Sequence, residues 1–154
     1  MDARLVITGI ALFFTGYAQA TPLFSFFGVK VDILLSLAVL VALSPRSLYE
    51  RAFLVIVGSA GLAVGAGIVP ALVFFSSIFF TAYIVRRAVP WQPFLVGGAL
   101  TLLFSFLVPV ALGWDVALRL APLTAREALY NLMAFAALYA LMPPRYARYG
   151  RNQF

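Results

Sequence analysis

The chain has 154 residues, of which 64% are hydrophobic and 10% are charged, and its formal net charge is +6. Soluble domains carry about 25% charged residues, so this composition excludes a water-facing surface and makes the membrane the solvent of the chain. The chain has no cysteine and no histidine. Their absence excludes disulfides, zinc or haem held by the usual ligands, and catalysis by a cysteine or histidine side chain.

Six apolar runs predict six transmembrane helices in a single domain, since about 20 apolar residues cross the hydrocarbon as a helix. They lie at about residues 5–20, 31–43, 52–68, 70–85, 94–112 and 125–142. The region 52–85 is divided because one helix of about 34 residues would reach roughly 50 Å. An amphipathic connection, residues 113–123, is expected before the last helix, and residues 143–154 form a basic tail.

The connections contain helix-ending residues. Pro22 and Gly28 end regular helix after the first span, and Pro45 ends the second. The charged residues that follow, Arg46, Glu50 and Arg51, are expected in a polar loop. The first apolar run is not interpreted as a signal peptide, because a single basic residue precedes it and more membrane segments follow.

The basic residues predict the orientation of the chain. With the N-terminus in the cytoplasm, the inner segments hold Arg4, Arg46, Arg51, Arg86, Arg87, Arg145, Arg148 and Arg151, and the outer segments hold Lys30, Arg119 and Arg126. Because Lys and Arg collect on cytoplasmic loops, we expect an inner-membrane protein with both termini in the cytoplasm. The same bias explains the positive charge without a nucleic-acid partner.

No ionisable residue is expected in the middle of a span. The acidic residues Asp2, Asp32, Glu50, Asp115 and Glu127 all fall at helix ends or in loops. Intramembrane charges mark ion and proton pathways, so this pattern argues against an ion-coupled pump and against an intramembrane enzyme. We expect no catalytic residue, no metal and no cofactor.

Small residues in the third predicted helix indicate close helix packing. The stretch GSAGLAVGAG contains Gly58, Gly61, Gly65 and Gly67, with Gly61 and Gly65 four residues apart. Small residues at this spacing let helix backbones approach in a membrane. Packing inside the bundle is the favoured interpretation, and contact with another protein is the alternative.

Two polar positions stand out. Asn131 lies inside the last span beside Tyr130. An amide there needs a partner, and an interhelical hydrogen bond that locks the bundle is the favoured interpretation. Lys30 and Asp32 form the second position. Asp32 is expected in the first turn of the second helix, where the helix dipole favours an anion, while Lys30 extends to water at the outer interface.

The arrangement resembles a known family, the bacterial rod shape-determining protein MreD. The resemblance covers essentially the whole chain and rests on the stretch AQATPLFSFFGVKVDILLSLAVLVAL at residues 18–43, on AREALYNLMAFAALYALM at residues 125–142, and on the six-segment form. Its motif residues are Gln19, Pro22, Gly28, Val29, Lys30, Asp32, Tyr130 and Asn131. The chain departs from the family in having no acid in the third helix and Val31 where a proline is usual.

The resemblance implies a non-enzymatic scaffold of the machinery that elongates the bacterial cell wall. Such a protein binds MreC, a membrane-anchored partner, and so connects the MreB filament with a RodA-type glycan polymerase and its transpeptidase. The basic tail would then face anionic lipid or a cytoskeletal partner, although a simple orientation signal is the favoured interpretation of this tail. The resemblance also implies the six-helix fold of the substrate-binding subunits of energy-coupling-factor transporters.

That fold supplies the alternative function, a substrate-binding subunit of a vitamin transporter, with a small-molecule permease as a third. A scaffold predicts a bundle core filled by side chains. Residues 23–32 and 113–123 then contact the extracytoplasmic domain of the partner. A transporter subunit predicts a polar pocket on the outer face, which Asp115, Arg119, Arg126 and Glu127 would line.

Overall fold

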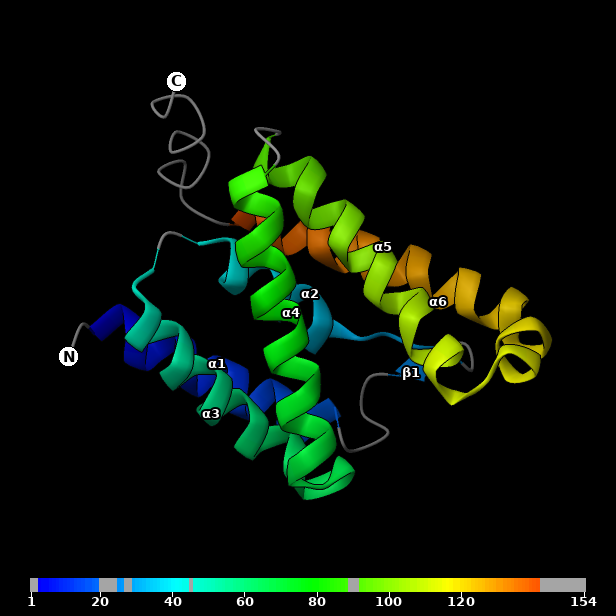
Figure 1. Ribbon diagram of the computed structural model, residues 1–154, viewed down its shortest axis with the longest axis horizontal. Helices are drawn as coiled ribbons and strands as arrows, with labels where there is room; N and C mark the ends of the chain where they lie inside the picture. Colours follow the sequence, from blue (N-terminus) through cyan, green and yellow to red (C-terminus); the bar gives the residue numbers. More distant parts are fainter. Residues whose placement is uncertain (1–2, 20–24, 27–28, 45, 89–91, 142–154) are drawn as a thin grey trace.

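A computed structural model describes residues 3–19, 25–26, 29–44, 46–88 and 92–141. These residues form α1 (Ala3–Gln19), β1 (Ser25–Phe26), β2 (Val29–Lys30), α2 (Ile33–Leu43), α3 (Leu48–Ala66), α4 (Ile68–Ala88), α5 (Pro93–Leu112) and α6 (Trp114–Leu141), as Figure 1 shows. The prediction of a helical chain is confirmed. Of the described helices, α3 and α4 are long and apolar enough to cross a membrane, judged by length and composition.

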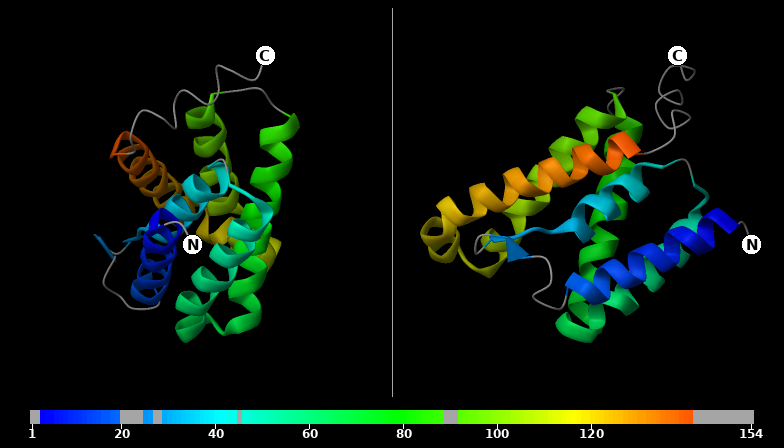
Figure 2. Two further views of the ribbon diagram at one scale, coloured as in Figure 1. Left: turned by 90° about the vertical axis from the view of Figure 1, so that its left-hand side faces the viewer. Right: turned by 180° about the vertical axis from the view of Figure 1, so that it is seen from behind.

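Helix α2 lies at the centre of the bundle. It contacts α1, α4, α5 and α6, and Figure 2 shows it between them. Its sequence, ILLSLAVLVAL, is apolar on every side. Such a helix is stable where protein or lipid surrounds it on every side. Eight of its eleven residues are buried, which explains how so short a helix organises the core.

Helices α1 and α3 run parallel, and glycines allow their close approach. A Cβ atom on Gly16 would lie 2.9 Å from the backbone nitrogen of Leu62, and one on Gly61 would overlap the carbonyl oxygen of Phe13. Gly58 faces a different neighbour, the ring of Phe75 on α4. Gly58 and Gly61 are thus packing positions inside the bundle, where they serve two separate helix pairs.

The turn between α3 and α4 is a single residue. It consists of Gly67, whose φ of +82° favours glycine over residues with a side chain. Helix α4 therefore begins at Ile68, ahead of Pro70, which the first turn of a helix tolerates because the amide hydrogens there have no intrahelical acceptor. Gly65 is exposed two residues before the bend.

The sequence analysis placed Glu50 and Arg51 in a polar loop, which is wrong, because both residues lie within α3. Ser47 and Glu50 form a capping box: the Ser47 hydroxyl accepts from the Glu50 amide at 3.3 Å, and Glu50 accepts from the Ser47 amide at 2.7 Å. These reciprocal bonds satisfy amide groups that a helix start leaves without partners. Helix α3 consequently begins at Leu48, four residues before the predicted start at residue 52.

The prediction of a separate connection before the last helix is also wrong. Residues predicted as a separate amphipathic stretch belong to α6, which begins at Trp114 and continues to Leu141. Asp115 lies in its first turn, where the positive end of the helix dipole favours a carboxylate. Pro122 lies inside the helix, and the helix continues through it.

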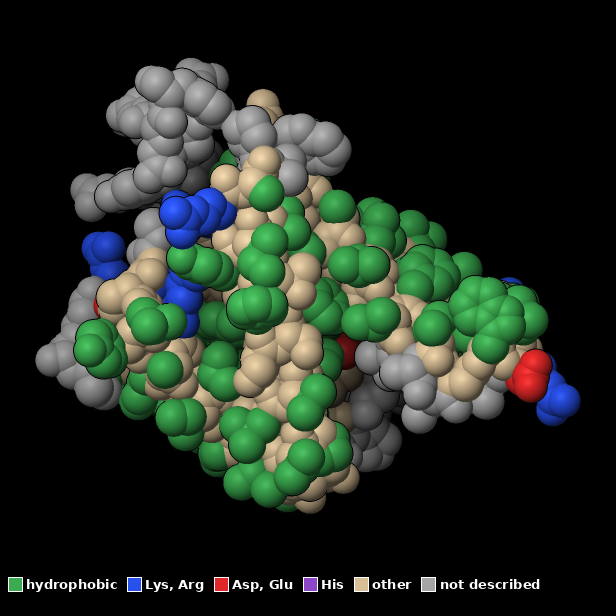
Figure 3. All heavy atoms as spheres, viewed as in Figure 1, with side chains coloured by type: hydrophobic (Ala, Val, Ile, Leu, Met, Phe, Trp, Pro, Cys, Tyr) green, Lys and Arg blue, Asp and Glu red, His purple; other side chains and the backbone are tan. Residues whose placement is uncertain are grey.

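Basic side chains gather at the end of the bundle where α1 and α3 begin and α4 ends (Figure 3). Arg46 donates to the Thr8 hydroxyl at 3.0 Å, and Arg86 donates to the carbonyl of Leu43 at 3.0 Å. The guanidinium carbon of Arg51 lies 5.3 Å from the centre of the Tyr83 ring. Contacts between residues far apart in sequence thus bring together positions that the sequence predicts on one side of a membrane.

Candidate functional site

The start of α2 is the place where most of the sequence-predicted residues meet. The chain reaches it through β2, with Val31 and Asp32 between strand and helix. Asp32 is the N-cap, and its side chain accepts from the backbone amide of Leu35 at 2.8 Å. Asp32 therefore lies at the start of this helix, but as its N-cap, one position ahead of the first turn in which the sequence analysis placed it.

Two amide side chains bind the backbone just before α2, one from each flank. Gln19, at the end of α1, donates from Nε2 to the carbonyl oxygen of Val31 at 3.2 Å. Asn131, on α6, accepts from the backbone amide of Asp32 through Oδ1 at 2.7 Å. Gln19 is 7% exposed and Asn131 is 3% exposed. We call these two residues, with Val31 and Asp32, the amide clasp.

The clasp extends from α6 to α5 and α2. Asn131 donates from Nδ2 to the Ser105 hydroxyl at 2.9 Å, and Ser105 donates to the carbonyl of Thr101 at 2.9 Å. The fully buried hydroxyl of Ser36 donates to the carbonyl of Asn131 at 2.9 Å. Asn131 therefore holds three helices together through both halves of its side chain and through its backbone.

The clasp satisfies backbone hydrogen-bonding groups inside an apolar bundle. The carbonyl of Val31 and the amide of Asp32 precede the first backbone hydrogen bond of α2, which the carbonyl of Asp32 accepts from the Ser36 amide at 3.3 Å. Peptide groups that remain without partners in hydrocarbon cost several kcal/mol each, and non-helical backbone is tolerated only where protein satisfies it. Gln19 and Asn131 supply that satisfaction.

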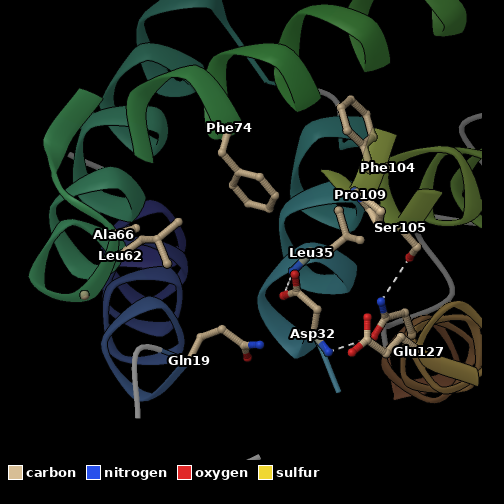
Figure 4. Close-up of a pocket in the computed structure, with 12 residues that line it drawn as sticks. Gln19, Asp32, Leu35, Leu62, Ala66, Phe74, Phe104, Ser105, Pro109 and Glu127 are labelled. Atoms are coloured by element: carbon tan, nitrogen blue, oxygen red, sulfur yellow. Dashed lines mark hydrogen bonds between the residues drawn. The ribbon is translucent and has the colours of Figure 1, made fainter. Parts of the chain in front are cut away.

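Beside the clasp lies a pocket of about 380 Å³. Figure 4 shows the side chains around it, with Phe74 of α4 and Phe104 of α5 in the upper part of the view and Gln19, Asp32 and Glu127 below them. Its polar lining consists of Gln19, Asp32, Ser105, Glu127 and Asn131, and its other lining residues are Leu35, Leu62, Gly65, Ala66, Phe74, Phe104 and Pro109. A volume of this size accepts a small organic molecule.

The pocket corrects part of the outer-face prediction. Glu127 lines it, whereas Asp115, Arg119 and Arg126 are exposed and do not. Asp32, Asn131 and Gln19 line it although they were singled out for other reasons. The apolar wall residues carry no local sequence signal, because Leu and Phe occur throughout this chain. Only the packing of six helices brings them to one place.

The remaining motif residues are not all in this site. Tyr130 is half-buried next to Asn131 and does not line the pocket, and the backbone of Lys30 lies in β2. Pro22, Gly28 and the basic tail at residues 143–154 lie outside the described residues. No group of three or more Asp and Glu side chains able to hold a metal occurs in the described part of the chain.

Comparisons with family models, with curated proteins and with solved structures found no match for this chain. The MreD resemblance therefore stays a prediction from the motif residues, which the geometry of the clasp now places in space.

Proposed function

We propose that the chain is a six-span membrane scaffold of the MreD kind, which works by binding a membrane-anchored MreC-type partner. The observation that carries this proposal is the meeting of its two motif stretches. Gln19 and Asp32 come from residues 18–43 and Asn131 from residues 125–142, and they join in one clasp. Motif residues whose side chains hold the helices together support a scaffold role in this proposal.

The exposed surface supports a membrane location for the five helices that surround α2. Large apolar side chains are more than half exposed on helices throughout the bundle, including Ile7, Phe14, Ile56, Phe80, Leu103 and Met133. Figure 3 shows apolar side chains over most of one face. Soluble monomers rarely expose contiguous apolar surface of this extent, and a lipid environment removes its cost.

The first part of α6 is the candidate partner surface. Trp114 is 68% exposed and Leu118 is 62% exposed, beside the exposed charges of Asp115 and Arg119. Under the predicted orientation this segment lies on the outer side, where an extracytoplasmic partner domain is reached. An exposed aromatic anchor with apolar and charged neighbours is the composition that favours a protein contact.

We expect Leu118→Ser to reduce recovery of an MreC-type partner from native membranes about tenfold, because burial of a leucine side chain contributes about 1.5–3 kcal/mol and a tenfold change in affinity corresponds to about 1.4 kcal/mol. The measurement is pull-down in mild detergent followed by quantification of the partner. The matched control is Met133→Ser, on the same helix and 59% exposed, which should leave recovery unchanged. If the wild-type chain recovers no such partner, the scaffold proposal is wrong.

A second candidate function is favoured by the pocket. A substrate-binding subunit of an energy-coupling-factor transporter would hold a vitamin in a cavity of this size, with the polar lining fixing its orientation. Such binding would raise the stability of the purified chain by about 4 kcal/mol at a ligand concentration of 1,000 times Kd. A thermal-shift panel of vitamins tests it, and a flat response to all of them excludes this function.

A further inference from the structure

Arginines from two helices meet where α3 begins and α4 ends. The guanidinium of Arg51 lies over the ring of Tyr83, and Arg87 donates from Nη1 to the hydroxyl of the same tyrosine at 3.3 Å. Arg86 lies close enough for its charge to act on that of Arg51. We call Arg51, Arg86 and Arg87 the arginine cluster. Its positive charges are held together around one tyrosine side chain.

The partners of the arginine cluster are neutral. Arg86 donates to the carbonyl oxygen at the end of α2, and Arg87 donates to a tyrosine hydroxyl. Within the described part of the chain, no acidic side chain forms an ion pair with the cluster. The acid next in sequence, Glu50, accepts from the amide and the hydroxyl of Ser47. Because like charges repel, a bound anion would stabilise the cluster.

Arg51 has hydrogen-bond donors left for such an anion. No hydrogen bond joins it to a described residue, and its Nε atom is buried. The terminal nitrogens Nη1 and Nη2 are therefore the donors that remain for a ligand. Tyr83 lies against a face of the guanidinium, whereas the N–H groups of a guanidinium point outward in its plane. The parallel N–H groups of Nη1 and Nη2 match the oxygen atoms of a phosphate.

The surroundings of the arginine cluster indicate the source of the anion. Of the described helices, α3 and α4 are long and apolar enough to cross a membrane, and the cluster lies at one end of both. The exposed side chains of Phe80 and Ile84 share a face of α4 with Arg87, seven and three residues before it. Figure 3 shows basic side chains at one end of an apolar surface. A phospholipid fits both parts, whereas dissolved phosphate would use only the arginines.

We propose that the arginine cluster binds the phosphate group of an anionic phospholipid, whose acyl chains lie along the exposed apolar face of α4. Arg51 donates charge-assisted hydrogen bonds to the phosphate, and Arg86 and Arg87 add positive charge. An arginine that only orients a membrane protein needs no partner beyond its place on the cytoplasmic side. The site rests on the membrane location in the proposed function but not on partner binding at α6, so lipid binding and partner recovery fail separately.

Thermal unfolding of the full chain in neutral detergent tests the site with three probes. They are dioleoylphosphatidylglycerol, dioleoylphosphatidylcholine, which has the same acyl chains and no net charge, and inorganic phosphate. We expect a saturable rise in Tm with phosphatidylglycerol and none with the other two, because a ligand that binds the folded state stabilises it. Equal shifts with the two lipids, an equal shift with inorganic phosphate, or no saturable shift with phosphatidylglycerol overturns the proposal.

Arginine variants separate this site from general attraction to the net charge of +6. Arg87→Gln, at an exposed position, should weaken phosphatidylglycerol binding about fivefold, the contribution of one basic residue at a membrane surface. Arg51→Lys keeps the charge but lacks the planar donor pair, and should also bind more weakly than the wild type. Arg119→Gln is the matched control, because it removes an exposed charge from the other end of the bundle and should bind as the wild type does. Equal losses in Arg87→Gln and Arg119→Gln, or wild-type affinity in Arg51→Lys, would overturn the site.

Discussion

Replacing Gly61 by leucine is expected to lower the stability of the folded bundle by about 3 kcal/mol or more, the upper range for overpacking. The side chain would enter the contact between α1 and α3, where the atoms in its way belong to the backbone of Phe13. A backbone segment inside a helix cannot rotate aside as a flexible side chain can, so the two helices must separate. Reversible unfolding in mixed micelles, with the helix signal followed by circular dichroism, measures the loss.

Gly65→Ala is the matched control for this substitution. Gly65 lies one turn further along α3 and is exposed, so an added methyl group meets solvent or lipid. Alanine also favours helix over glycine by up to about 1 kcal/mol. The control should therefore equal or exceed the wild type in stability. Equal stability of Gly61→Leu and the wild type would show that α1 and α3 do not approach as described.

Asn131→Leu is expected to destabilise the bundle by about 2 kcal/mol. Leucine has a similar size but cannot accept from the Asp32 amide or donate to Ser105, the two bonds that join α6 to α2 and α5. The loss combines a buried amide hydrogen without an acceptor with a broken interhelical bond. The same unfolding assay measures it.

A graded series makes this prediction specific. Ser105→Ala removes only the acceptor for Asn131 Nδ2 and should cost about 1 kcal/mol or less. Met133→Leu, two residues further along α6 and exposed, should be neutral. A chain in which Asn131→Leu is as stable as Met133→Leu would exclude the amide clasp as a stabilising feature.

The helices of this fold could be predicted from the sequence, because a long apolar run has few possible structures other than a helix. Five of the six helices begin within four residues of the predicted starts, whereas α6 begins eleven residues before its predicted start. At α3 a polar side chain decides the boundary. Glu50 reads as a loop residue by its charge, yet it starts α3 through its bond to Ser47. Charge alone does not reveal such reciprocal capping.

Only part of the candidate site could be predicted from the sequence. Asn131 could be recognised as needing a partner, because an amide among apolar residues has few ways to be satisfied. Its partner, the Asp32 amide, is 99 residues away and is identified only by the fold. Gln19 carried the same signal at the end of α1. The hairpin of β1 and β2 depends on backbone pairing over two residues per strand, which is too short for a pattern to reveal.

The most direct test of the account is the accessibility of the two ends of the bundle. The chain has no cysteine, so a single introduced cysteine is a unique label site. In intact bacterial cells, a membrane-impermeant maleimide should label Ala66→Cys and Arg119→Cys. It should reach Ser47→Cys and Arg87→Cys only after permeabilisation, since these four exposed positions lie at opposite ends of the bundle. Labelling of all four positions in intact cells, or the reverse pattern, would contradict a six-span bundle whose clasp and pocket face outward.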